Sequence, residues 1–123
     1  MTKRILIIED QEDNRAIMRD LLSTAGYALI EAVDGEEGVK LARSERPDLI
    51  LMDIQLPVLD GYEATRRIRA MPDLKSVPII AVTSYALSGD EAKTREAGCD
   101  SYVAKPFSPR ELLAKVRALL PNG

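Results

Sequence analysis

The chain has 123 residues, of which 46% are hydrophobic and 30% charged, and its net charge is −3 at neutral pH. This length suits one domain with a proper core, and the composition is that of a globular protein rather than a disordered one. The acidic balance disfavours nonspecific nucleic-acid binding, so we expect no nucleic-acid partner. No apolar run approaches the roughly 18 residues of a membrane span, so we expect no membrane partner either.

The amino-terminal residues lead directly into a short apolar run without a cleavable signal pattern, so we expect a cytoplasmic protein. The single cysteine, Cys99, can form no internal disulfide and is expected to be a packing residue. There is no histidine, which removes the commonest general base and transition-metal ligand. Arg66, Arg67 and Arg69 form a small basic group that we expect on a solvated helix face.

The first part of the chain predicts two strands with a helix between them. Residues 5–8 are apolar and rich in β-branched side chains, which predicts a central strand. Apolar residues at helical spacing follow over 17–25, and Gly26 is expected to end that helix. Residues 28–32 predict a second strand. Residues 34–37 (Asp-Gly-Glu-Glu) then begin a second helix with the pattern of a capping box.

The middle of the chain repeats this alternation. Pro47 ends the second helix, and the four apolar residues 49–52 are typical of a strand buried on both faces. Residues 60–63 repeat the capping pattern and predict a third helix. Pro78 is compatible with the first residue of a strand or with an edge strand, and it introduces a fourth apolar strand at 79–82.

The last part of the chain adds two more helices and a strand. Residues 88–91 form another capping pattern, and Gly98 is expected to close the helix that they begin, whose apolar periodicity is weak. Residues 102–104 predict a short fifth strand. A capping box at 108–111, with proline at the first helical position, predicts a strongly amphipathic fifth helix.

Strands and helices thus alternate along the whole chain without a linker or repeat, so we expect residues 1–123 to form a single domain. Such alternation is typical of an α/β fold with a parallel sheet and helices on both faces. The second strand has the shortest stretch of clear strand-forming residues, so we expect it to be an edge strand of the sheet. We therefore predict a doubly wound (βα)5 flavodoxin-like fold whose five strands have the order 2-1-3-4-5.

Residues that could carry chemistry follow four of the predicted strands: Glu9 and Asp10, Asp53, Thr83, and Lys105. In a parallel sheet these strand ends share one edge, and ligands bind just beyond it. Three carboxylates brought together would repel one another, and a hard divalent cation such as Mg²⁺ relieves that repulsion. A lysine and a hydroxyl add groups that can contact a phosphoryl oxygen.

This set of residues meets the needs of phosphoryl transfer. Asp53 is the natural nucleophile, because a carboxylate needs no general base and would form an acyl phosphate. Each residue alone has a simpler interpretation. Asp10 could cap the next helix with Asp13 in its first turn, Asp53 could cap a turn, and Lys105 could be a solvated charge. Their joint occurrence at several strand ends favours a phosphoryl-transfer site.

The sequence resembles the receiver domains of two-component response regulators over essentially its whole length. The resemblance rests on four segments in the family's order and spacing: Ile-Ile-Glu9-Asp10, Leu-Met-Asp53-Ile-Gln-Leu-Pro57-Val-Leu-Asp60-Gly61, Val-Thr83-Ser and Tyr102-Val-Ala-Lys105-Pro106-Phe. The chain has no room for an output domain, so the resemblance implies a stand-alone regulator of the DivK or CheY kind. The strand order 2-1-3-4-5 is also the order of this family, so that prediction is not independent of the resemblance.

The resemblance implies a phosphoacceptor and a metal site. Asp53 would accept a phosphoryl group from the phosphohistidine of a sensor histidine kinase or a histidine phosphotransfer protein. Mg²⁺ would be held by Glu9, Asp10, Asp53 and the backbone carbonyl of Gln55, with Glu9 acting mostly through bound water. The protein would catalyse only its own phosphotransfer and slow autodephosphorylation, and it would not be an enzyme in the usual sense.

The resemblance also implies a switch. Lys105 and Thr83 would contact the phosphoryl oxygens, and the Lys105–Pro106 bond would be cis. Tyr102 would turn inward when Thr83 moves toward the phosphate, although an aromatic residue at a strand can also serve packing alone. Downstream protein targets would bind the face formed by the fourth helix, the fifth strand and the fifth helix.

Other functions stay open at this point. A Mg²⁺-dependent phosphohydrolase would share the aspartyl nucleophile, but such enzymes resemble Asp-x-Asp, and Asp53-Ile-Gln55 lacks the second acid. A flavin or nucleotide carrier would need a glycine-rich phosphate loop, which does not follow the first strand. The chain could also be a receiver cut from a hybrid histidine kinase, or a degenerate receiver used only for docking.

Overall fold

The computed structural model describes residues 2–84 and 90–120. Its elements are β1 (Arg4–Ile8), α1 (Glu12–Thr24), β2 (Ala28–Ala32), α2 (Gly35–Glu45), β3 (Leu49–Asp53), α3 (Gly61–Arg69), the 3-10 helix η1 (Pro72–Leu74), β4 (Ile79–Thr83), α4 (Asp90–Ala97), β5 (Ser101–Ala104) and α5 (Pro109–Leu119). Within these residues, no helix has the length and apolar character needed to cross a membrane.

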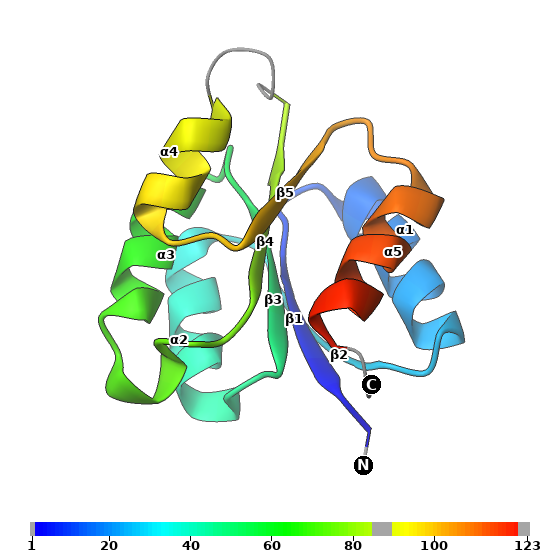
Figure 1. Cartoon of the computed structure of the whole chain (residues 1–123), viewed down its shortest axis with the longest axis horizontal. Helices are drawn as coiled ribbons and strands as arrows, with labels where there is room; N and C mark the ends of the chain where they lie inside the picture. Colours follow the sequence, from blue (N-terminus) through cyan, green and yellow to red (C-terminus); the bar gives the residue numbers. More distant parts are fainter. Residues whose placement is uncertain (1, 85–89, 121–123) are drawn as a thin grey trace.

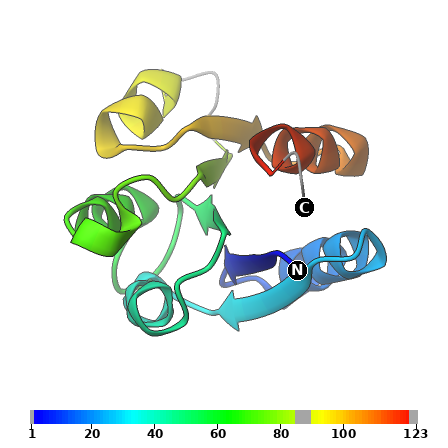
Figure 2. The same cartoon turned by 60° about the horizontal axis from the view of Figure 1, so that its bottom comes forward.

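The five strands form one parallel sheet in the order β2-β1-β3-β4-β5, which confirms the predicted fold and strand order. Helices α1 and α5 cover one face of this sheet, and α2, α3 and α4 cover the other (Figures 1 and 2). Because all strands run in the same direction, their carboxyl ends lie together at one edge, which is the upper edge in Figure 1.

Two hydrophobic clusters lie on opposite sides of the sheet. Alternate residues of each central strand point into different clusters, as the pleat of a strand requires. In β1, for example, Leu6 and Ile8 pack with α2 and α3, whereas Ile5 and Ile7 pack with α1 and α5. Every residue of β3 is buried, in agreement with the apolar run from which a strand covered on both faces was predicted.

The predicted capping residues begin three of the helices. The side chains of Asp34, Asp60 and Ser108 accept hydrogen bonds from the backbone N–H groups three residues later, at α2, α3 and α5. Such caps stabilise a helix by about 1 kcal/mol each. The capping pattern at 88–91 lies partly outside the described residues, but Gly98 does follow α4 with a φ of +114°.

The simpler interpretation of Asp10 as a helix cap does not hold, because the residue before α1 is Gln11 and no side chain caps the first turn of this helix. One local expectation differs from the structure. Arg69 does not lie on a solvated face. Its guanidinium donates to the carbonyls of Gly98 and Leu74 and pairs with Asp100, so it joins the end of α3 to two later connections. The positions of these partners depend on the tertiary fold, so the local sequence gave no sign of them.

Candidate functional site

The ends of β1 and β3 bring three carboxylates together. Ile8 of β1 pairs with Met52 of β3. The residues that follow them, Glu9 and Asp53, are therefore also neighbours. Both carboxylates are almost fully buried, and Asp10 beside them is partly buried. One oxygen from each of Glu9, Asp10 and Asp53 can be chosen so that all three lie within 4.8 Å of one another.

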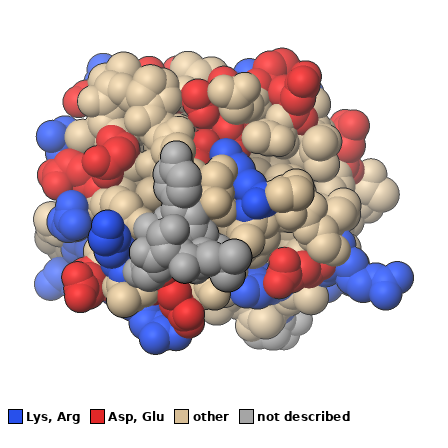
Figure 3. All heavy atoms as spheres, turned by 90° about the horizontal axis from the view of Figure 1, so that it is seen from above, with Lys and Arg blue, Asp and Glu red and all other residues tan. Residues whose placement is uncertain are grey.

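The ends of β4 and β5 supply a hydroxyl and an ammonium group to the same edge. Thr83, the buried last residue of β4, pairs with Ala104, and Lys105 follows directly. The backbone N–H of Lys105 donates to the carbonyl of Thr83 over 2.8 Å. Figure 3 views the molecule from this edge and shows acidic and basic side chains meeting near the middle of the face.

Lys105 lies between the two buried carboxylates. Its Nζ donates to Asp53 Oδ2 over 3.0 Å and forms an ion pair with Glu9 Oε1 at 3.2 Å. Burial works to lower the pKa of Lys105, but the contacts with Asp53 and Glu9 outweigh it and hold this pKa above its ordinary value. The amine is therefore a fixed positive charge at neutral pH.

Asp53 is held in an unfavourable environment for a charged carboxylate. Burial, followed by the nearby charge of Glu9, raises the pKa of Asp53 to about 7, although Lys105 works in the opposite direction. Its other oxygen, Oδ1, accepts a hydrogen bond from the backbone N–H of Gln55 over 3.1 Å. One lysine thus compensates two buried carboxylates, and the site retains an excess of negative charge.

The donor set fits a magnesium ion. Glu9 Oε1 is buried and, despite the ion pair with Lys105, has no hydrogen bond, so one oxygen of the cluster still lacks a full partner. Each of the three clustered residues offers a carboxylate oxygen, and such hard oxygen ligands are the kind that Mg²⁺ prefers. A hard divalent cation would satisfy the buried oxygen and offset the excess negative charge.

The side chain of Gln55 has a position that the sequence did not predict. Its Nε2 donates to Thr83 Oγ1 over 3.1 Å, and its Oε1 accepts from the backbone N–H of Ser84 over 3.0 Å. The amide therefore bridges the loop after β3 to the end of β4. Local sequence does not indicate this contact, because Gln55 and its side-chain partner Thr83 are separated by 28 residues.

Tyr102 lies between α4 and α5. Its hydroxyl donates to Glu91 Oε2 over 3.4 Å, and Lys115 Nζ lies 5.3 Å from the centre of its ring. The same ammonium group donates to the carbonyl of Tyr102 over 2.6 Å. The peptide bond between Lys105 and the following proline is cis.

Comparison with known proteins agrees with this geometry. Residues 5–117 match the family model of the response regulator receiver domain. The chain is 42% identical over 123 residues to the polar-differentiation response regulator DivK of Brucella ovis, and the match covers 100% of both chains.

Two solved structures have the same fold. The receiver domain of a sensor histidine kinase from Pseudomonas aeruginosa, whose active-site cleft coordinates a magnesium ion, is 41% identical with a TM-score of 0.92, over 99% of this chain and 100% of that one. The chemotaxis response regulator CheY4 of Vibrio cholerae is 27% identical with a TM-score of 0.92, over 97% and 99%. The strand order, the buried acidic cluster and these similarities lead to one conclusion: the chain belongs to the response regulator receiver domains of two-component signalling.

Proposed function

We propose that Asp53 accepts a phosphoryl group from a phosphohistidine of a sensor histidine kinase or a histidine phosphotransfer protein. The observation that carries this proposal is the buried Asp53 carboxylate, 3.0 Å from the ammonium group of Lys105 at the carboxyl edge of the sheet. A carboxylate oxygen attacks phosphorus as the P–N bond breaks. The electron pair of that bond stays on the imidazole nitrogen, and the product is an acyl phosphate.

The neighbouring residues have separate roles in this proposal. Glu9, Asp10, Asp53 and the backbone carbonyl of Gln55 hold Mg²⁺, which supplies charge neutralisation for the phosphoryl oxygens. The family binds Mg²⁺ at such an acidic pocket, and the carboxylates of the described residues cluster accordingly. Lys105 already donates to the accepting carboxylate, so its ammonium group can follow the charge as it moves to phosphorus.

We further propose that residues 1–123 act as a single receiver domain whose switch is Thr83 with Tyr102. Phosphorylation adds negative charge at Asp53, which attracts the hydroxyl of Thr83 and leaves space for the ring of Tyr102 to turn inward. Tyr102 contacts Glu91 of α4 and Lys115 of α5, so this movement changes both helices at the face made by α4, β5 and α5. That face binds the downstream protein target.

Phosphorylation by a small donor tests the acceptor. Incubation with acetyl phosphate and Mg²⁺ should add one phosphoryl group to the wild type by intact mass and none to Asp53→Asn. Asp20→Asn is the matched control, because Asp20 is an exposed acid on α1 outside the cluster. Labelling of Asp53→Asn to the wild-type level would overturn the assignment. Hydrolysis of a general phosphate ester over many turnovers would instead support a phosphohydrolase.

A further inference from the structure

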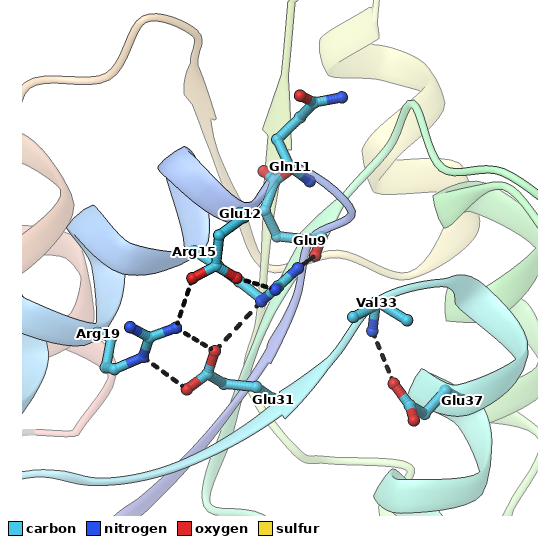
Figure 4. A network of polar contacts seen from close by, with 8 residues as sticks. All are labelled: Glu9, Gln11, Glu12, Arg15, Arg19, Glu31, Val33 and Glu37. Carbon is cyan, nitrogen blue, oxygen red and sulfur yellow. Dashed lines mark hydrogen bonds and ion pairs between the residues drawn. The ribbon is translucent and has the colours of Figure 1, made fainter.

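Arg15 reaches from α1 to the backbone of the acidic cluster. Figure 4 shows its guanidinium among residues from the end of β1, from α1 and from β2. Its Nη1 donates to the backbone carbonyl of Glu9 over 2.9 Å, its Nε donates to Glu31 Oε1 over 3.2 Å, and its Nη2 pairs with Glu12. Only 12% of the Arg15 side chain is exposed, so this is a packed contact rather than a surface ion pair.

The Glu9 carbonyl is a sensitive point for the metal site. It belongs to the peptide unit that joins Glu9 to Asp10, so a rotation of this unit would move both carboxylates relative to Asp53. The N–H of Glu9 donates to the carbonyl of Ala32 in β2 over 3.0 Å. The N–H side of Glu9 is thus fixed by β2, and its carbonyl side is fixed by Arg15.

Glu31 of β2 anchors the Arg15 side chain. Its carboxylate also accepts two hydrogen bonds from Arg19, at 2.8 and 2.9 Å. Arg19 pairs with Glu12 as well, so the two arginines share both acidic partners. They differ in one contact, because the hydrogen bonds of Arg19 go to Glu12 and Glu31, whereas Arg15 also donates to the Glu9 carbonyl.

We propose that Arg15 is a positioning residue for the metal site, which holds the Glu9–Asp10 peptide so that both carboxylates face Asp53. This inference rests on the metal site proposed above. It makes Glu31 part of the same support, because the carboxylate fixes the guanidinium against β2. Partners of this kind, one step away from the ligands, typically change metal affinity by about 10- to 100-fold when they are removed.

The direction of the effect separates positioning from simple electrostatics. Arg15 is a cation near a site for a cation, so its removal should strengthen Mg²⁺ binding if only charge mattered. If Arg15 positions the carboxylates, its removal should weaken binding. Arg19→Ala removes the same charge from the same ion-pair network and leaves the contact between Arg15 and the Glu9 carbonyl in place.

Calorimetric titration with Mg²⁺ tests the inference. We expect Arg15→Ala to bind about 10-fold more weakly than the wild type, and Arg19→Ala to bind much as the wild type does. Arg15→Lys should recover part of the affinity, because a lysine can donate to the carbonyl but cannot hold Glu31 with the same planar fork. Amide hydrogen exchange without metal adds a second measurement. Exchange at residues 9–11 should be faster in Arg15→Ala than in Arg19→Ala.

The outcomes that contradict the inference are distinct. Equal or tighter Mg²⁺ binding by Arg15→Ala would overturn it, and so would equal losses in the Ala variants of Arg15 and Arg19. If the wild type bound no Mg²⁺, the proposed metal site would fail and this inference with it. Binding by the wild type with no difference between the two variants would overturn the positioning role alone.

Discussion

Asp53 is placed where its charge opposes folding. An ordinary aspartate has a pKa near 3.8, and burial beside Glu9 raises the pKa of Asp53 to about 7 in the folded chain. Between these values the folded state binds a proton that the unfolded state has released. The free energy of unfolding therefore falls as the pH rises through this window. The residue proposed to accept the phosphoryl group thus makes the metal-free protein less stable at neutral pH.

Replacement of this carboxylate by an amide of the same shape should stabilise the protein. In urea unfolding at pH 8 without Mg²⁺, we expect the free energy of unfolding of Asp53→Asn to exceed that of the wild type by roughly 1–3 kcal/mol. The variant relieves repulsion with Glu9, and Lys105 keeps Glu9 as a partner. The difference should shrink toward pH 4, where the wild-type carboxylate is protonated. A variant that is less stable than the wild type at pH 8 would show that the Lys105 contact outweighs burial and repulsion.

Some residues of the site could be placed from the sequence, and others could not. Glu9, Asp53, Thr83 and Lys105 could be predicted to meet because each lies at the end of an apolar run, and a parallel sheet aligns those ends. The support given by Arg15 could not be predicted. Arg15 donates to a backbone carbonyl, and a backbone partner is not visible in the residue types of a sequence. The carboxylate that anchors Arg15 belongs to Glu31, which is 16 residues away.

At the scale of elements, the start of α3 is packed against the end of β3. A Cβ atom added to Gly61 would lie 2.3 Å from the backbone oxygen of Asp53 and 2.6 Å from the Cα atom of Ile54. The N–H of Gly61 also donates to the carbonyl of Ile54 over 3.0 Å. The sequence predicted that this helix begins at Asp60-Gly61, but it gave no indication that the first residue of the helix packs against the backbone of Asp53.

Gly61→Ala should therefore disturb both stability and the site. We expect a loss of about 1–3 kcal/mol in the free energy of unfolding, which is typical of overpacking against a backbone that must shift. Labelling by acetyl phosphate should also slow, because that shift moves Asp53. Gly26→Ala is the control. Its added Cβ would meet no atom within 4 Å but would be strained by a φ of +98°, so it should lose stability while labelling at the wild-type rate. Equal labelling by both variants would contradict the link between this packing and the site.

At the scale of the whole molecule, the fold could be predicted because local and global signals agree. Apolar runs, proline positions and capping boxes each mark the same boundaries, and the alternation of strands and helices leaves a parallel sheet as the natural arrangement. The predicted strands agree with the observed ones to within one residue at each end, and the second strand has the same extent in both. The sequence could not show how single side chains such as Arg69 and Gln55 join distant connections, since these contacts exist only after the sheet has formed.

Metal binding at the proposed site would also stabilise the entire fold, because the clustered carboxylates come from the ends of two separate strands. A cation that binds only the folded arrangement stabilises it by RT ln(1 + [Mg²⁺]/Kd), or about 2.7 kcal/mol at 100 times Kd. We expect Mg²⁺ to raise the melting temperature of the wild type at constant ionic strength, and the chelator EDTA to reverse the change. Asp10→Asn should lose most of this shift, since it removes one of the three clustered carboxylates. Asp20→Asn should keep it, and an equal shift in both variants would place the stabilising ion outside the cluster.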